Sequence, residues 1–216
     1  MEASEQRVAK RPRDPESTRS ALLEAATGLF STVGFDGATT DRIARNAGVN
    51  KALISYHFGG KAGLYRAILC ATFREMNSQL EAIDDARLPA GERLDGLIAA
   101  FANVHRLRPW FPSMLLREVL SGGHHLDEAA LPEFLSIFGH VRRLVADGIR
   151  DGSFRPVDPL LTHLSVVGSL VFFFATIPLR ERLVAEGKIP FAAPTADQYV
   201  RHVRELMAKG LAPDPT

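Results

Sequence analysis

The spacing of apolar side chains predicts helices along almost the entire chain of 216 residues. Within residues 15–33 they recur at steps of three and four, which places them on one helical face: Leu22, Ala25, Ala26, Leu29 and Val33. Asp14 is suited to cap this helix, Pro15 to its first position and Gly34 to the left-handed residue that ends it. No segment shows the alternating pattern of a strand, so the predicted fold class is all-α.

Two short helices are predicted next, over residues 39–48 and 50–58, with a tight turn through Gly48 between them. A threonine can cap the first helix, and Asn50 can cap the second. Gly48 supplies the left-handed backbone conformation that the turn requires. This arrangement is typical of a helix-turn-helix, in which the second helix enters the major groove of DNA.

Side-chain chemistry gives the second of these helices an inner and an outer face. Val49 would fill the angle between the two helices, and Ile54 and Phe58 would hold the second against the first. Small outward side chains let a helix sink into the major groove, where Lys51 could reach guanine acceptors or a phosphate. The residues expected to contact DNA, at base edges or phosphates, are Thr39, Thr40, Arg42, Asn50, Lys51, Ala52, Ser55, Tyr56, His57 and Lys61.

Several of these side chains also have a purely structural interpretation. Tyr56 could serve mainly in packing, His57 could cap a helix or lie in solvent, and Arg42 could belong to a solvated face. Four basic residues also precede the first helix, in "RVAKRPR", which could be a minor-groove arm or a disordered leader.

The formal net charge of +1 argues against a surface coated in positive charge. Residues 1–75 carry eleven Lys and Arg against eight Asp and Glu, a formal +3, which leaves −2 for residues 76–216. This small asymmetry is a hint that the front of the molecule has an anionic partner.

Further helices are predicted from Lys61 to about residue 82 and over 91–107, 110–121, 132–152, 158–176 and 195–210. Thr195 and Gln198 have the spacing of a capping box. The segment 158–176 is apolar on more than one face, so it must be buried against its own core or against a second subunit. Together with 195–210 it could form half of a four-helix bundle in a homodimer.

The segment from Thr39 to Leu69 resembles the DNA-binding segment of the TetR family of bacterial regulators, and the match covers about residues 15–75. The family pattern is met by Thr39-Thr40, Ile43-Ala44, Ala47-Gly48-Val49, Tyr56-His57-Phe58, Lys61 and Leu64. The resemblance implies an all-helical, DNA-binding homodimer with a divergent C-terminal domain for a small effector. The sequence departs from the family at Ser55, where a Tyr that commonly touches DNA is most often found, and at Leu53, usually a smaller polar residue.

An effector pocket is expected in the C-terminal part of the chain, where the resemblance is least informative. The stretch "HRLRPWFPSMLLREVL" combines aromatic residues with an occasional polar group, which suits a mostly apolar cavity. The pocket candidates are Trp110, Phe111, Met114, Arg117, His140 and Phe173. The alternative is that they are ordinary core residues, with Arg117 paired to an acid. His140 and His163 lie on apolar helical faces, as core histidines often do.

An enzymatic function has little support in the sequence. His124, His125, Asp127 and Glu128 could hold a metal, but adjacent histidines after two glycines favour a solvated loop. No nucleophile–base pair, phosphate loop or helical metal-ligand spacing is present. The single cysteine, Cys70, excludes an internal disulfide and is interpreted as a small core residue. We therefore predict no metal site, no cofactor and no enzymatic activity.

The sequence is thus divided into a basic arm at 1–14, a helix-turn-helix DNA-binding domain at 15–75 and an effector-binding and dimerisation domain at 76–216. The predicted function is a repressor that a small molecule releases from a palindromic operator, and an activator of the same fold is the alternative. The longest apolar run, residues 164–177, is shorter than the roughly 20 residues of a membrane span, and no signal peptide is visible. A cytoplasmic protein without a membrane partner is expected.

Overall fold

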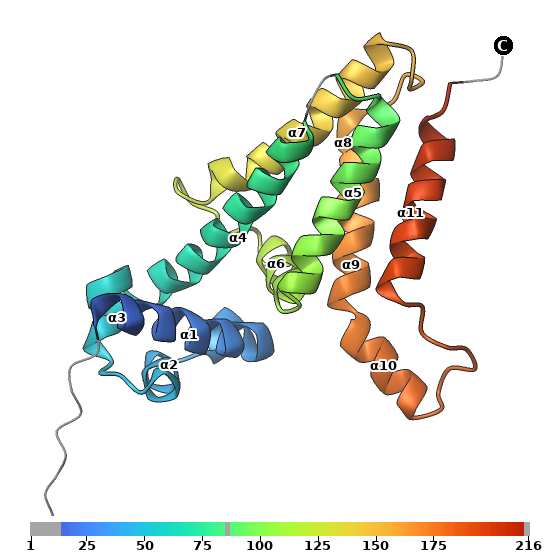
Figure 1. The fold of residues 1–216 in the computed structure, drawn as a ribbon. Coiled ribbons are helices and arrows are strands. Elements are labelled where there is room, and N and C mark those ends of the chain that lie inside the picture. Colours follow the sequence, from blue (N-terminus) through green and yellow to red (C-terminus); the bar gives the residue numbers. More distant parts are fainter. Residues whose placement is uncertain (1–13, 85–86, 214–216) are drawn as a thin grey trace, which may run out of the picture.

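The computed structural model describes residues 14–84 and 87–213, and within these ranges every regular element is helical (Figure 1). In chain order the elements are α1 (Pro15–Gly37), α2 (Thr40–Ala47), α3 (Ala52–Phe58), α4 (Lys61–Ile83), α5 (Ala90–Leu107), α6 (Phe111–Leu120), α7 (Leu131–Arg150), α8 (Pro159–His163), the π-helical turn η1 (Leu164–Gly168), α9 (Ser169–Ala175), α10 (Ile177–Ala185) and α11 (Ala196–Leu211). The all-α fold class is confirmed. The basic arm predicted at residues 1–14 lies outside the described residues, except for Asp14.

Helices α1, α2 and α3 gather at one end of the molecule, and α4 leads from them into the C-terminal helices (Figure 1). Helix α1 packs against both α2 and α4, and α3 packs against α4. The side chains fully buried at their centre come from all four helices: Leu22, Phe30, Ile43, Ile54 and Leu64. This shared core stabilises α3, because an isolated helix of only 7 residues is unstable in water.

The first helix changes direction at Gly34, whose φ of +74° lies in the left-handed region. Residues with a β-carbon rarely adopt this conformation, so a glycine is favoured here. The predicted break at Gly34 is confirmed, but helical structure resumes after it as far as Gly37, which the sequence pattern did not predict.

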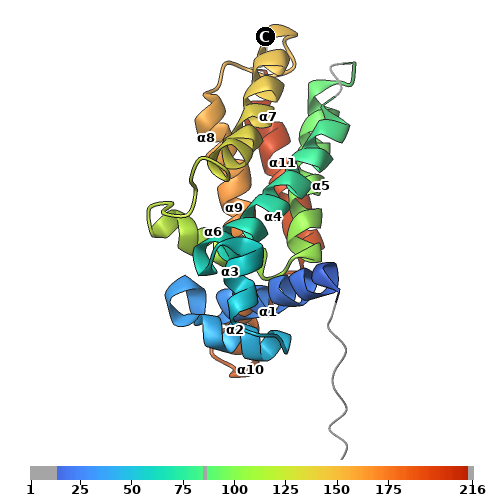
Figure 2. The same ribbon diagram turned by 90° about the vertical axis from the view of Figure 1, so that its left-hand side faces the viewer.

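The C-terminal helices pack around α5 and α9, with α11 along one side and α7 crossing beside α4 (Figures 1 and 2). Their shared core is apolar and rich in aromatic rings: Phe73, Met76, Ile98, Phe101, Phe111 and Phe173. Helix α4 contributes to this core as well as to the core of α1–α3. It therefore connects the two halves of the molecule mechanically.

The segment 158–176 is helical without interruption from Pro159 to Ala175, as predicted, but it is not a regular α-helix throughout. It is divided into α8, η1 and α9, and a further helix that the sequence did not predict, α10, follows directly. Pro178, near the start of α10, favours a helix beginning at that point. Among the described residues no single helix is long and apolar enough to cross a membrane. In the described part of the chain, one pair of helices passes that test of length and composition when the two are taken together: Pro159–Ala175 and Ile177–Ala185, which meet at a bend of 45°.

Helix α11 begins with the predicted capping box. The Thr195 hydroxyl accepts a hydrogen bond from the Gln198 N–H, and the Gln198 side chain accepts one from the Thr195 N–H. Val200 and Val203 are buried against α5 and its neighbours, as their spacing predicts. Leu206, which the same spacing places on the inner face, is instead exposed.

Candidate functional site

The ends of α2 and α3 follow the predicted helix-turn-helix chemistry. The Thr39 hydroxyl caps α2 by accepting from the Arg42 N–H at 3.3 Å, and Gly48 ends it with φ 64° and ψ 36°. The Asn50 side chain accepts from the Ala52 N–H at 2.8 Å, which satisfies a donor at the start of α3. These contacts fix the turn, and therefore the direction in which α3 leaves it.

The inner face of α3 is anchored in the core, as predicted. Ile54 is buried, and Val49 and Phe58 pack partly buried against the same cluster. The guanidinium of Arg19 lies over the Phe58 ring, 5.3 Å from its centroid, and contributes a cation–π contact from α1. Because α3 is held from one side, its opposite side is available for a partner.

The close approach of α3 and α4 depends on Gly63, a residue that the sequence reading did not single out. A β-carbon at position 63 would lie 1.8 Å from the carbonyl oxygen of Phe58. Only a glycine allows the first turn of α4 to pass so near the last turn of α3. A glycine inside an otherwise good helical pattern was the available signal.

The outer face of α3 carries Lys51, Ala52, Ser55 and Tyr56, all exposed. Tyr56 is 80% exposed, and its ring stands edge-on to the ring of His57 at 4.9 Å. Most of the Tyr56 side chain therefore lies in solvent, which argues against the alternative that Tyr56 serves mainly in packing. Lys51 forms an exposed ion pair with Asp41 of α2, with Nζ and Oδ2 2.9 Å apart.

Lys61 has partners that the sequence did not predict. Its ammonium donates to the carbonyl oxygens of Phe35 and Ala38, at 2.9 and 3.0 Å, and lies 4.0 Å from the centroid of the Phe35 ring. These contacts join the first residue of α4 to the connection between α1 and α2. Lys61 therefore has a structural role, and its expected phosphate contact stays a prediction.

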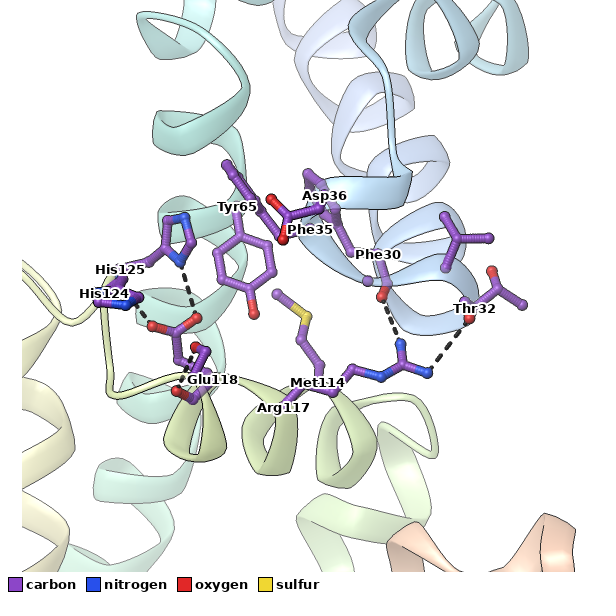
Figure 3. A pocket seen from close by; sticks show the side chains of 13 residues that line it. Phe30, Thr32, Phe35, Asp36, Tyr65, Met114, Arg117, Glu118, His124 and His125 are labelled. Carbon is purple, nitrogen blue, oxygen red and sulfur yellow. Dashed lines mark hydrogen bonds and ion pairs between the residues drawn. The ribbon is translucent and has the colours of Figure 1, made fainter.

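A cavity of about 550 Å³ lies at the junction between the two halves of the molecule (Figure 3). The end of α1, Tyr65 of α4, helix α6 and the loop after α6 line it. Arg117 of α6 donates to the carbonyl oxygens of three consecutive residues at the end of α1: Phe30, Ser31 and Thr32. The alternative that Arg117 pairs with an acid is wrong, because backbone carbonyls at a helix end satisfy its guanidinium.

A buried carboxylate lies on the other side of this cavity. Glu118 is 2% exposed, and its two oxygens contact the N–H and Nδ1 of His125 at 2.7 and 3.0 Å (Figure 3). The His125 ring packs against the rings of Phe35 and Tyr65, with centroids 4.1 and 4.8 Å away. Burial raises the pKa of the Tyr65 hydroxyl well above its usual range, and the Glu118 carboxylate raises it further.

A second cavity, of about 50 Å³, lies inside the C-terminal domain. Helices α4, α5, α6 and α7 and the α8–α9 segment all contribute to its wall. The wall consists of apolar side chains and two histidines: Phe73, Met76, Phe101, His105, Phe111, Leu115, Phe134, Leu135, Ile137, Phe138, His163, Val167 and Val171.

Two sequence profiles of known families match the chain. Residues 22–68 match the bacterial regulatory proteins of the tetR family, and residues 91–207 match the tetracyclin repressor-like C-terminal domain. Together the two matches cover both halves of the structure. The chain belongs to the TetR family.

Similar proteins span nearly the same length. The HTH-type transcriptional regulator RutR of Escherichia coli K12 is 27% identical over 204 residues, which cover 94% of this chain and 95% of RutR. The HTH-type transcriptional repressor NicS of Pseudomonas putida is 30% identical over 168 residues, 76% of this chain and 78% of NicS. A solved tetR-family structure from Rhodococcus RHA1 shares the fold, with a TM-score of 0.75, 17% identity and coverage of 92% of this chain and 98% of that one.

As a member of the TetR family, the chain is a DNA-binding transcriptional regulator and not an enzyme. The helix-turn-helix described above lies within the matched N-terminal region, and both cavities involve the matched C-terminal region. Within residues 14–84 and 87–213 no group of three or more His, Cys, Asp or Glu side chains is placed to hold a metal ion.

The six candidates for the effector pocket of this TetR-family protein do not share one cavity. Phe111 lines the apolar cavity, whereas Met114 and Arg117 line the junction cavity. The physical reason is helical geometry. At about 100° per residue, Leu115 lies close to Phe111 on α6, whereas Arg117 lies about 120° away from Phe111 and Met114 lies between those two directions. Trp110 packs edge-on against Phe111 and lines neither cavity.

The two remaining pocket candidates also have other roles. His140 is buried, 3.4 Å from Asp84 and hydrogen-bonded to Arg143. Burial and the Arg143 charge lower the pKa of His140, against the opposing effect of Asp84. Phe173 stacks on Tyr199 with ring centroids 4.0 Å apart, and both are core contacts. His140 and Phe173 line neither of these two cavities, and their place in an effector pocket stays a prediction.

Proposed function

We propose that this regulator is a homodimeric repressor that binds a palindromic operator and leaves it when a small molecule binds the C-terminal domain. The observation that carries the proposal is the outer face of α3, which is exposed on a helix held firmly from its other side. Repression rather than activation is favoured because the similar protein NicS bears the name of a repressor. Since its partner is bacterial chromosomal DNA, the protein would act in the cytoplasm.

The α3 face has the chemistry to read a major groove. Lys51 and Tyr56 would reach base edges or phosphates, and the small side chains Ala52 and Ser55 would let the helix approach closely. Thr39, Thr40, Arg42, Asn50, His57 and Lys61 are proposed to contact the DNA backbone or to orient the residues that do. In this proposal Lys51 exchanges its exposed ion pair with Asp41 for a contact to DNA, which costs little because exposed ion pairs are weak.

Exposed apolar side chains support dimerisation through residues 158–176 and 195–210. Leu160, Leu161, Leu164 and Phe172 are all more than half exposed in the first segment, as is Leu206 in the second. Apolar side chains grouped on a surface in this way are typical of protein–protein interfaces. A two-fold dimer would set its α3 helices about 34 Å apart, the distance between successive major grooves on one face of DNA.

The effector signal would pass through the junction between the domains. Arg117 and Glu118 are adjacent on α6, and Arg117 binds the carbonyls at the end of α1. A shift of α6 would therefore carry α1, and with it the α2–α3 unit. Such a shift changes DNA affinity only if the effector binds one arrangement better than the other.

The proposal is tested by selecting genomic DNA fragments with the purified protein at two salt concentrations. We expect a palindromic sequence to be enriched, with binding that falls steeply as salt rises. A Tyr56→Ala variant should lose this enrichment, whereas Leu120→Ala, which changes an exposed residue of α6, should retain it. Recovery of fragments without any sequence preference would contradict the proposal.

A reporter gene behind the recovered operator separates repression from activation. Repression predicts higher reporter expression when the regulator gene is deleted, and activation predicts lower expression. Lower expression would show that the protein binds the same DNA but activates transcription.

A further inference from the structure

The apolar cavity contains two histidines whose ring nitrogens lack hydrogen-bond partners. His105 is 1% exposed, and within the described residues neither of its ring nitrogens makes a hydrogen bond of normal geometry, although the backbone carbonyl of Phe101 is near enough to affect the ring. Nδ1 of His163, on the facing segment, is also buried without a partner. Buried polar groups in proteins are nearly always paired, because leaving one without a partner is costly. Two such groups beside one cavity indicate that something else pairs with them.

Both imidazoles are neutral near neutral pH. Burial lowers the pKa of His105 to about 4, although the carbonyl of Phe101, one turn earlier, acts in the opposite direction. Burial also lowers the pKa of His163. A neutral imidazole has one N–H donor and one ring nitrogen that accepts, so this wall can pair with a hydroxyl group.

The rest of the wall excludes a charged ligand. Every other residue around the cavity, as far as the chain is described, is Phe, Met, Leu, Ile or Val. A carboxylate or ammonium group would be taken out of water here without a counter-ion, which is costly. Five aromatic rings, those of Phe73, Phe101, Phe111, Phe134 and Phe138, instead favour an apolar and preferably aromatic body.

Part of the cavity wall is incompletely buried. The volume of about 50 Å³ admits only a few non-hydrogen atoms, so a larger ligand must displace part of the wall. The least buried wall residues are Leu135, which is exposed, and Phe134, Phe138, His163 and Val167 of η1, which are partly buried. A π-helical turn interrupts the regular hydrogen bonds of a helix and is frequent at functional sites.

We propose that this cavity binds an uncharged, mostly apolar molecule whose hydroxyl group forms hydrogen bonds with His105 and His163. The inference rests on the proposed function, for which it names the effector site and the chemical class of the effector. His105 provides specificity, and the aromatic wall provides most of the affinity.

Three probes that differ in one group test the chemistry. They are para-butylphenol, butylbenzene and para-butylbenzoate, titrated calorimetrically into the full-length protein without DNA. We expect para-butylphenol to bind about 10-fold more tightly than butylbenzene, the effect of one hydrogen bond to an otherwise unpaired group. Para-butylbenzoate should bind at least as weakly as butylbenzene. Equal affinities for the phenol and the hydrocarbon, or a preference for the benzoate, would overturn the proposal.

Variants of His105 locate the hydrogen bond. His105→Leu should reduce the 10-fold preference to about one while butylbenzene still binds, and His105→Gln, which keeps a donor and an acceptor, should restore part of it. His202→Leu, a change at an exposed histidine of α11, should keep the wild-type preference. A preference that survives in His105→Leu would contradict the proposal.

Nuclear magnetic resonance of the wild-type protein keeps the test decisive even if a variant does not fold. In protein labelled with ¹⁵N-histidine, para-butylphenol should shift the ring nitrogens of His105 more than those of His125. The opposite result would place the probe in the junction cavity and overturn the assignment. Because no DNA is present, these outcomes are independent of operator binding, which alone decides the proposed function.

Discussion

At the scale of single residues, the two lysines near α3, Lys61 and Lys51, differ in what they contact. Lys61 donates to two backbone carbonyls and covers an aromatic ring, whereas Lys51 has one exposed carboxylate partner. Hydrogen bonds from a charged donor to partly buried carbonyls stabilise more than an exposed ion pair does. Lys61 therefore stabilises the fold, whereas Lys51 is free to exchange its exposed partner for DNA in the proposed complex.

We expect Lys61→Met to lower the free energy of unfolding by about 1–3 kcal/mol, because the Phe35 and Ala38 carbonyls lose a charged donor. Lys51→Met is the matched control and should change it by less than about 0.5 kcal/mol. Urea denaturation measures both. If Lys51→Met were the more destabilising of the two, this division of roles would be wrong.

The buried His105 imidazole predicts a pH dependence of stability. Its folded-state pKa of about 4 is below the usual 6.5, so the unfolded chain binds a proton first as pH falls. The stability that neutral His105 contributes is therefore fully present above about pH 6.5 and is lost as the pH falls from about 6.5 to about 4. Between pH 7.5 and 5 the wild-type protein should lose about 2 kcal/mol more than His105→Leu.

Denaturation at the two pH values measures this difference, with His202→Leu as the control that keeps the wild-type pH dependence. Identical pH dependence in the wild type and His105→Leu would show that His105 is not buried in neutral form.

At the scale of elements, the contact between α6 and the end of α1 is a second link, beside α4, between the C-terminal helices and α1–α3. Arg117 makes this link by donating to the carbonyl oxygens of Phe30, Ser31 and Thr32 beside the break at Gly34. Arg117→Ala should therefore increase amide hydrogen exchange in the last turn of α1 and in the connection to α2. Exchange in α11 should stay unchanged, as should the α1 pattern of the control variant Arg150→Ala. Unchanged exchange in α1 of Arg117→Ala would contradict this role.

The elements also show where sequence reasoning succeeds and where it does not. Caps and turns are predictable because they depend on neighbours in the chain, as Thr39, Gly48 and Thr195 illustrate. The division of 158–176 was not predictable, because an all-round apolar segment gives no periodic signal where a π-helical turn or a new helix begins.

The binding cavities were the least predictable feature. His105 and Phe111 lie on different helices, and only tertiary packing brings them to one cavity. Arg117 was weighed as an acid-paired cation, yet it donates to backbone carbonyls of α1 that lie far away in the sequence. The helix-turn-helix was easier to predict, because its pattern is contiguous in the chain.

At the scale of the whole molecule, the exposed apolar side chains of 158–176 and 195–210 require a partner in the proposed assembly. Phe172→Glu should convert the protein from dimer to monomer in analytical ultracentrifugation, because a charge would be buried in an apolar interface. Leu120→Glu, at an exposed leucine outside both segments, should remain a dimer. A dimer of unchanged stability in Phe172→Glu would place the interface elsewhere.

Two copies of α3 are proposed to read a palindrome together, and a footprint on the recovered operator tests this. We expect two protected half-sites with centres about 34 Å apart, on one face of the DNA, and loss of both in Tyr56→Ala. Protection of a single half-site, or protection that Tyr56→Ala leaves intact, would show that the two α3 helices do not bind DNA in this way.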